Sequence, residues 1–256
     1  QACSAALRGK GFQVIELDAG LDVVQRLSEL RPDVVFNALH GRWGEDGSIQ
    51  GLLEWLRIPY THSGVMASAL AMDKQRSKHI FSNSGLPTAP GFMIDKSGLL
   101  TSHPLDKPYV VKPINEGSSI GVYFVNPKED RPLKVASDMP SILMVEEYIP
   151  GRELTVTVMG KKALAVTDII TQNWYDYDAK YKKGGSIHEV PAKIPKIIQE
   201  KCLEYALSAH ELIGCRGISR ADFRWDESLG LDGLILLEIN TQPGMTPTSL
   251  VPEQAQ

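Results

Sequence analysis

The sequence has few cysteines, no long apolar run and no excess of positive charge. Its three cysteines, Cys3, Cys202 and Cys215, are widely spaced without a CxxC pair, which favours reduced thiols over a disulfide framework or a zinc site. The net charge of −4 and the lack of a basic stretch argue against binding to a nucleic-acid backbone. Apolar runs such as residues 234–237 are far too short to cross a bilayer. We therefore expect a cytoplasmic protein with no nucleic-acid partner and no membrane partner.

The composition is that of a globular protein. Hydrophobic residues make up 43% and charged residues 23% of the 256 residues, close to the average of folded domains, which excludes a disordered chain. Because the length exceeds the usual size of one domain, we expect two or three lobes with a cleft between them.

Residues 1–64 have the pattern of a small α/β lobe. An extended segment at 12–15, a helix at 22–30, a strand at 33–36 and a helix at 49–57 alternate along the chain. Such alternation is typical of a parallel sheet with flanking helices.

Two further lobes are predicted, at 65–145 and 146–256. The middle lobe should be mostly antiparallel, with a long helix at 66–83 and strands at 109–112, 121–125 and 142–145. The last lobe should contain strands at 153–158 and 163–170, a polar loop at 174–189, a helix at 197–213 and strands at 220–225 and 234–240.

Four polar residues on the last two predicted strands are the strongest chemical signal. Residues two apart on a strand face the same side, so Arg220 and Asp222 project together, as do Glu238 and Asn240. Carboxylate and amide oxygens suit magnesium, and an arginine beside them can neutralise a phosphoryl group. Exposed charges on two ordinary strands are an equally good interpretation of either pair alone. That alternative is weaker for Glu238, which interrupts an apolar run where an unpaired carboxylate would be expensive to bury.

Other segments give weaker signals. Lys112 begins a small-residue loop whose backbone N–H groups could hold phosphates, although the spacing is not that of a Walker loop. The strand end at 145–153 could offer its backbone to an adenine. His40 lies in a polar loop where open α/β sheets bind ligands, but a structural histidine is as plausible there. For Lys74, a solvated lysine on a helix is the simpler interpretation.

Five motifs in order resemble the D-alanine–D-alanine ligase family over nearly the whole chain. They are HGRWGEDG at 40–47, MDK at 72–74, the segment from Lys112-Pro113 to EGSS at 116–119, YDYDAKY at 175–181 and EINTQPGMT at 238–246. The resemblance implies an ATP-grasp fold of mixed α/β class, with three lobes of which the first is Rossmann-like. ATP would lie between the middle and last lobes, and D-alanine where these meet the first.

The resemblance also implies a role for each matching residue. The nucleotide would be bound by residues of the middle and last lobes: Lys74, Lys112, Ser119, Glu146, Glu147, Ile149, Glu153, Trp174 and Lys180. The D-alanines would contact His40, Ser249 and Leu250. Two Mg²⁺ ions, for which Mn²⁺ can substitute, would be held by Asp222, Glu238 and Asn240. The catalytic groups would be Arg220, Ser118, Tyr181 and the backbone of Gly244.

The implied reaction converts one D-alanine to an acyl phosphate with ATP, and the amine of the second D-alanine then attacks it. The product, D-alanyl-D-alanine, is used in peptidoglycan synthesis, and the resemblance implies a homodimer. Tyr181 favours an amine as the second nucleophile. The family has a first strand with a glycine-rich loop and a final helix, which we expect outside residues 1–256. D-lactate or D-serine as second substrate, or a non-catalytic nucleotide-binding module, are the alternatives.

Overall fold

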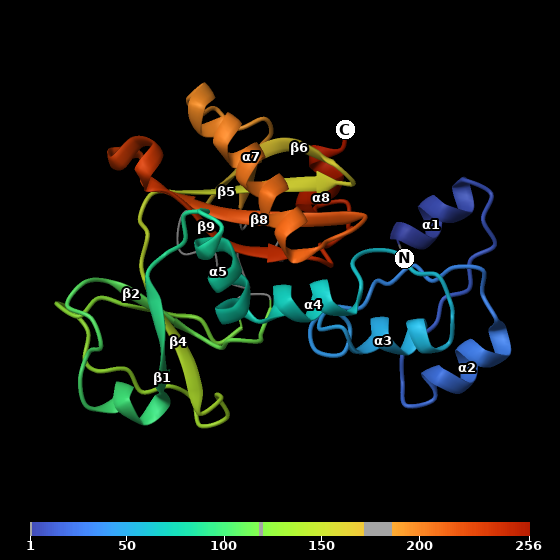
Figure 1. The fold of residues 1–256 in the computed structure, drawn as a ribbon, viewed down its shortest axis with the longest axis horizontal. Helices are drawn as coiled ribbons and strands as arrows, with labels where there is room; N and C mark the ends of the chain where they lie inside the picture. The colour runs from blue at the N-terminus through green and yellow to red at the C-terminus, as the bar shows by residue number, and fades with distance from the viewer. Residues whose placement is uncertain (1, 118–119, 172–185) are drawn as a thin grey trace.

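The computed structural model describes residues 2–117, 120–171 and 186–256. Three short helices gather at the amino-terminal end: α1 (Ala2–Gly9), α2 (Val23–Leu30) and α3 (Ser48–Trp55) (Figure 1). Helices α2 and α3 agree with the predicted pattern, but the strand predicted at 33–36 is reduced to one parallel bridge between Val35 and Tyr60. The segment at 12–15 joins no sheet among the described residues, so neither segment forms a strand there.

The long helix predicted at 66–83 is wrong, because it is broken in two. Helix α4 (Val65–Met72) ends at Asp73, whose backbone is extended (φ −85°, ψ 97°), and α5 (Lys74–Asn83) starts directly after it. The Asp73 carboxylate accepts a hydrogen bond from the Arg76 backbone N–H at 3.0 Å. Aspartate is a preferred N-cap because it satisfies an N–H group that has no partner inside the helix.

A four-stranded antiparallel sheet forms the middle of the chain. Its strands are β1 (Gly91–Asp95), β2 (Tyr109–Lys112), β3 (Tyr123–Val125) and β4 (Ile142–Glu147), in the spatial order β1-β4-β2-β3. The antiparallel pairing is as predicted, but β1 was not predicted. The 3₁₀ helix η1 (Lys96–Leu100) follows β1 and buries Leu99 against this sheet.

The carboxyl-terminal part contains a five-stranded antiparallel sheet, in the order β7-β6-β5-β8-β9. Its strands are β5 (Arg152–Met159), β6 (Lys162–Ile170), β7 (Ile187–Glu189), β8 (Ile218–Trp225) and β9 (Leu234–Asn240). Four of the strands were predicted. The fifth, β7, was expected to be loop, but it pairs with β6 through three residues.

Helix α7 (Lys196–Ile213) lies across one face of this sheet (Figure 1). It ends as predicted at Gly214, whose φ of 77° lies in the left-handed region that glycine adopts easily. Helix α7 and α5 pack with the sheet to form the larger hydrophobic core, so the polar face of β8 and β9 is turned away from it. The 3₁₀ helix η2 (Glu227–Gly233) connects these two strands.

The short helix α8 (Leu250–Gln254) closes the chain against β5 and β6. Its buried Gln254 accepts a hydrogen bond from the Thr157 N–H at 2.7 Å and donates one to the Thr167 hydroxyl at 2.9 Å. This places the segment before α8 beside the polar face of the sheet. Within the described ranges, no helix has the length and apolar character needed to cross a membrane.

Candidate active site

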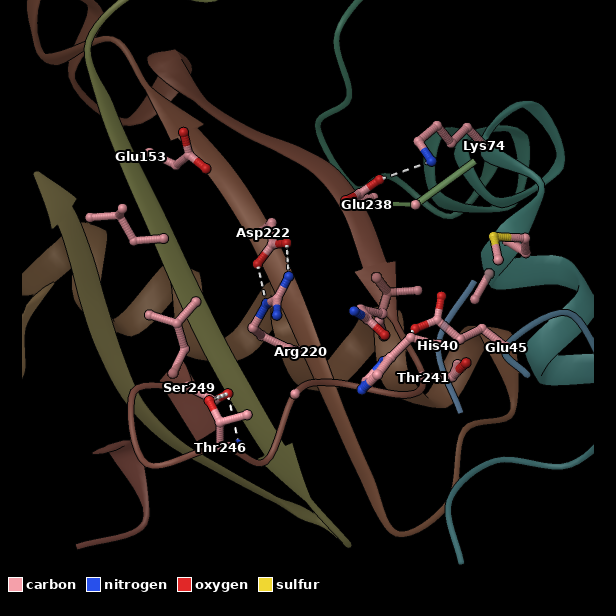
Figure 2. Close-up of a pocket in the computed structure, with 18 of the residues that line it drawn as sticks. His40, Glu45, Lys74, Glu153, Arg220, Asp222, Glu238, Thr241, Thr246 and Ser249 are labelled. Carbon is pink, nitrogen blue, oxygen red and sulfur yellow. Dashed lines mark hydrogen bonds and ion pairs between the residues drawn. The ribbon is translucent and has the colours of Figure 1, made fainter. Parts of the chain in front are cut away.

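The four polar residues predicted to converge do lie on one face of the β8–β9 pair. Burial alternates along β8, so Arg220 and Asp222 face the cleft while Ala221 and Phe223 are buried in the core. In the pairing register Arg220 is opposite Asn240, and Asp222 is opposite Glu238. The carboxylates and the guanidinium therefore meet in one cavity (Figure 2).

A β-bulge explains how Glu238 can follow an apolar run without being buried. Glu238 is opposite Asp222 and Leu236 is opposite Phe223, so Leu237 is the extra residue. The bulge turns both Leu237 and Glu238 toward the cleft, where they line the same cavity. Simple alternation would have placed these neighbours on opposite faces.

Each carboxylate of the cluster already has a positively charged partner. Asp222 accepts two hydrogen bonds from Arg220, at 2.8 and 2.7 Å, and a third from the Thr155 hydroxyl at 2.6 Å. The Glu238 carboxylate lies 3.2 Å from the ammonium of Lys74. The partly buried charges of the cluster therefore balance one another, as groups removed from water must.

Lys74 is held in the cleft, so the interpretation as a solvated lysine is wrong. As the first residue of α5, it donates its backbone N–H to the Ile114 carbonyl at 3.1 Å. Its ammonium donates to the Glu116 carbonyl at 2.6 Å and is buried. The break at Asp73 thus fixes Lys74 to the loop after β2, the loop predicted to hold phosphates.

Glu146 forms a buried ionic cluster beneath this loop. It is 3% exposed and forms ion pairs with Lys78 and Lys112, which are almost as buried. Lys78 also donates to the Ala89 carbonyl at 2.7 Å. Burial opposes ionisation of Glu146, but the two lysines outweigh it and hold its pKa below the usual value. The cluster places the positive charge of Lys112 at the edge of a cavity.

Two adjoining cavities occupy the cleft. The first lies between strands β8 and β9, the segment at 244–250 and the loop that carries His40. The second lies between the two sheets. Both are lined by Lys74, Glu153, Asp222 and Glu238. A molecule that filled the second cavity would therefore meet the contents of the first at the charged cluster.

The first cavity is bounded by a histidine–carboxylate pair and a tight turn. His40 Nδ1 lies 3.0 Å from a carboxylate oxygen of Glu45, and this hydrogen bond raises the pKa of His40 above its usual value. Ser249 accepts a hydrogen bond from the Thr246 N–H at 3.0 Å. A Cβ at Gly244 would lie only 2.9 Å from the Ser249 hydroxyl, so a larger residue there would displace the Ser249 side chain.

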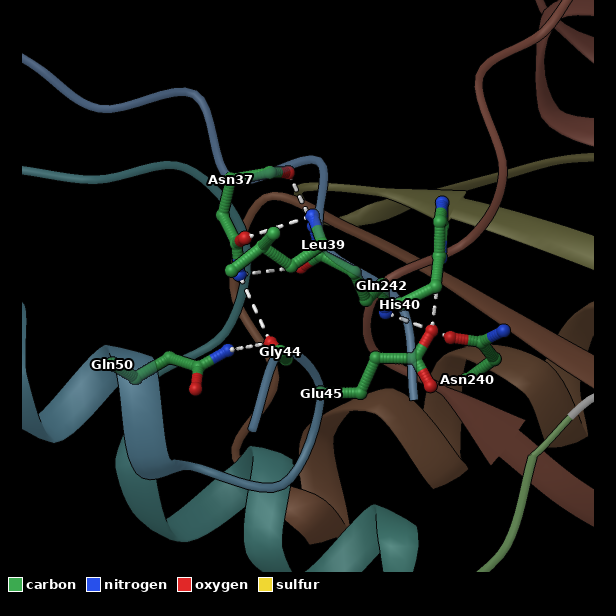
Figure 3. A network of polar contacts seen from close by, with 8 residues as sticks. All are labelled: Asn37, Leu39, His40, Gly44, Glu45, Gln50, Asn240 and Gln242. Atoms are coloured by element: carbon green, nitrogen blue, oxygen red, sulfur yellow. Dashed lines mark hydrogen bonds and ion pairs between the residues drawn. The ribbon is translucent and has the colours of Figure 1, made fainter. Parts of the chain in front are cut away.

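A buried polar network attaches the His40 loop to the end of β9 (Figure 3). Gln242 donates to the Asn37 carbonyl, and Asn37 donates to the Gly44 carbonyl at 3.0 Å. The Gln50 side chain donates to the same carbonyl at 2.9 Å. The backbone N–H of Gln242 in turn donates to the Asn240 side chain at 2.8 Å. The network therefore fixes the position of the His40 loop relative to Asn240, the metal-ligand candidate at the end of β9.

The structure brings most of the predicted site residues together. Those that line one or both cavities are His40, Lys74, Lys112, Glu146, Glu147, Ile149, Glu153, Arg220, Asp222, Glu238, Asn240, Gly244, Ser249 and Leu250. The other five predicted residues lie outside the described part of the chain: Ser118, Ser119, Trp174, Lys180 and Tyr181.

Several cavity residues were missed by the sequence analysis, namely Glu45, Tyr148, His188 and Arg224. Arg224 continues the cleft-facing series of Arg220 and Asp222 by two positions, so strand alternation could have identified it. His188 lies on β7, which was expected to be loop. No sequence pattern marked it.

The donor atoms of the cluster fit magnesium. Asp222, Glu238 and Asn240 offer only oxygen ligands, which Mg²⁺ prefers, and Mg²⁺ completes its shell with waters and phosphate oxygens. Within the described residues, no group of three His, Cys, Asp or Glu side chains could hold a metal ion. The candidate ligands are therefore two carboxylates and an amide. They suit an ion that also binds phosphate oxygens of a substrate.

Two antiparallel sheets, a cavity between them lined by lysines, and a cluster of oxygen ligands at its inner end define an ATP-grasp enzyme. Residues 14–63 match the family model described as the D-ala D-ala ligase N-terminus, and residues 80–256 match that of the C-terminus. The chain belongs to the D-alanine–D-alanine ligase family.

Individual relatives agree with this assignment. The chain is 64% identical to the D-alanine–D-alanine ligase of Ruegeria pomeroyi and 65% identical to that of Cereibacter sphaeroides. Each alignment covers 99% of this chain and 83% of the relative. The crystal structure of the Bacillus anthracis D-alanine–D-alanine ligase complexed with ATP superposes with a TM-score of 0.75 at 28% identity, covering 96% of this chain and 80% of that one.

Proposed function

We propose that this enzyme uses ATP to join two D-alanines into D-alanyl-D-alanine for cell-wall synthesis. The observation that carries the proposal is the position of the charged cluster, where Lys74, Asp222 and Glu238 line both cavities. ATP in the cavity between the sheets would present its phosphates to D-alanine in the other cavity at that point. Family membership supplies the identity of the amino acid.

The reaction needs activation because a carboxylate is a poor acyl donor. Transfer of the γ-phosphoryl group to one D-alanine gives D-alanyl phosphate, and the amine of the second D-alanine displaces the phosphate. Such a reaction depends on positioning and on neutralising charge, not on a nucleophilic side chain. Arg220 would offset the charge that develops on the transferring group, and the Gly244 backbone would assist it.

Residues of the first cavity would hold the amino acids. His40 would lie near the first D-alanine, while Ser249 and Leu250 at the start of α8 would bind the carboxylate of the second. We assign Ser118 and Tyr181 to the link between the phosphate loop and this cavity. In that role, Tyr181 would exclude the water that competes with the amine.

Residues of the second cavity would hold ATP. The lysines Lys74 and Lys112, with Ser119 and Lys180, would contact the phosphates. The adenine would lie against the strand end, where its contacts would be Glu146, Glu147, Ile149 and Trp174. Glu153 would accept hydrogen bonds from the ribose hydroxyls.

Asp222, Glu238 and Asn240 would hold two Mg²⁺ ions, for which Mn²⁺ can substitute. When bound, these ions offset phosphate charge. The supporting observation is the oxygen-only donor set at the meeting of the two cavities.

We further propose three lobes, with boundaries at 1–64, 65–145 and 146–256, acting in a cytoplasmic homodimer. The two separate sheets support the last two lobes, since each has its own hydrophobic core. The three free cysteines suit a reducing compartment. No membrane or nucleic-acid partner is part of the proposal.

The test measures ADP formation with and without D-alanine, together with the product. We expect ADP only when D-alanine is present, and D-alanyl-D-alanine as product in competition with D-lactate and D-serine. Glu238→Gln should lower kcat by at least ~100-fold, as the loss of a transition-state contact does, whereas the exposed control Glu200→Gln should not change it. ADP formation that is independent of D-alanine would refute the proposal.

A further inference from the structure

Arg224 extends the cleft-facing side of β8 beyond Asp222 and lines the cavity between the sheets. We propose that Arg224 is a positioning residue for the base and ribose end of ATP, acting through the strand connection at 148–151 and through Glu153. The inference rests on the proposed function, because it assigns that end of the cavity to the nucleoside.

The first argument is the set of bonds that Arg224 makes to the connection between β4 and β5. Its Nε donates to the Ile149 carbonyl at 3.1 Å, and its Nη2 donates to the Gly151 carbonyl at 2.9 Å. The same Nη2 lies 3.2 Å from the Tyr148 hydroxyl, and the guanidinium lies 5.5 Å from the centre of the Tyr148 ring. One side chain thus contacts three residues of the irregular segment between β4 and β5.

The rigid fork of arginine suits this task. Its N–H groups point in fixed directions within one plane, so they can bond to two carbonyls and a hydroxyl at once. With the Ile149 and Gly151 carbonyls both bonded to Arg224, the backbone of this segment is held in one orientation. A lysine would supply a charge but not this geometry.

The second argument is the pairing of Arg224 with Glu153. The two residues are directly opposite in the β5–β8 register, and Nη1 lies 3.5 Å from the Glu153 carboxylate. Both side chains are largely buried. Opposite charges at such a position stabilise each other across the strands, so Arg224 restrains the carboxylate proposed to accept the ribose hydroxyls.

These contacts predict an effect confined to one end of ATP. Loss of Arg224 removes the hydrogen bonds to the Ile149 and Gly151 carbonyls and the ion pair that helps to orient the Glu153 carboxylate. Discrimination between ATP and 2′-deoxy-ATP should fall, because the 2′-hydroxyl would no longer meet an oriented acceptor. The phosphate contacts of Lys74 and Lys112 should be unaffected, since their bonds lie on other elements.

The test compares the binding of ATP, 2′-deoxy-ATP and inorganic tripolyphosphate to the whole protein by calorimetry in the presence of magnesium. In Arg224→Met we expect ATP affinity to fall about 10- to 100-fold, as the loss of buried hydrogen bonds implies. The preference for ATP over 2′-deoxy-ATP should approach one, and tripolyphosphate affinity should not change. Arg224→Lys should restore little of that preference.

Glu153→Gln provides a second measurement that keeps Arg224 in place. It should also reduce the ribose preference, and combining it with Arg224→Met should reduce the preference no further. An unchanged ratio in folded Arg224→Met refutes the proposal, and so does equal weakening of tripolyphosphate. If Arg224→Met does not fold, the proposal is tested on Glu153→Gln alone. It is then refuted if that variant prefers ATP over 2′-deoxy-ATP as strongly as the unsubstituted protein does. Failure of the proposed function would appear separately, as ADP formation that does not require D-alanine.

Discussion

The buried cluster of Glu146, Lys78 and Lys112 makes the sharpest prediction about stability. Glu146→Gln keeps the shape of the side chain but removes its charge. Two nearly buried ammonium groups would then lose the one carboxylate that pairs with them among the described residues, although Lys78 would keep its bond to the Ala89 carbonyl. We expect the substitution to lower the free energy of unfolding substantially.

The size follows from the burial of all three residues. Removing one partner of a buried ion pair costs about 3–5 kcal/mol, because an uncompensated charge stays in the protein interior. For a chain of this size each kcal/mol lowers Tm by about 2–4 °C, so the expected decrease is roughly 6–20 °C. The control is Lys107→Met, which removes the exposed partner of Glu147 at 2.6 Å. It should cost less than about 1 kcal/mol.

The measurement is urea unfolding followed by fluorescence, repeated across the acid range. Glu146 has a pKa below its usual 4.5 in the folded protein, so its ionic contribution is complete above pH 4.5 and is lost as the pH falls through the folded pKa. The difference between Glu146→Gln and the unsubstituted protein should therefore be constant above pH 4.5 and shrink below it. A decrease in the free energy of unfolding of less than about 1 kcal/mol at neutral pH would show that Glu146 is not needed to neutralise the two lysines.

Two further predictions concern the residues that shape the cleft. His40 should titrate with a pKa above 6.5 in NMR spectra, and Glu45→Gln should lower the pKa of His40. The hydrogen bond between His40 and Glu45 contributes its full stabilisation below pH 6.5, and this contribution is lost as the pH rises through the folded pKa of His40. An unshifted titration would contradict the pairing. Asp73→Ala should cost about 1 kcal/mol of stability and raise the KM for ATP by releasing Lys74. Asp95→Ala, which removes the cap of η1 at a residue that lines neither cavity, should leave that KM unchanged.

Strand alternation predicted the cleft-facing side of the last two strands well. Arg220 and Asp222 form one pair and Glu238 and Asn240 the other, and the register brings them together as expected. The prediction succeeded because each pair is separated by one buried residue, which is the period of a strand. The bulge at Leu237 could not be predicted from the alternation of residues, because an extra residue breaks the two-residue period.

Failures occurred where a local pattern was overruled by a distant contact. Residues 66–83 are helical on both sides of Asp73, where the Lys74 N–H bonds to the distant Ile114 carbonyl and does not continue helix α4. Strand β7 is a three-residue element stabilised by its pairing with β6. The segment at 33–36 has strand-forming residues but only one backbone neighbour among the described residues. In each case the deciding partner is far away in the sequence.

The break at Asp73 also bears on how this region can change in evolution. Two helices that share one axis share a rotational phase, so a one-residue deletion in the first would turn every side chain of the second by about 100°. Here the start of α5 is fixed by its own cap and by the bond from Lys74 to Ile114. Changes in the length of α4 can therefore be absorbed at the junction, and the lysine keeps its direction while the preceding helix varies.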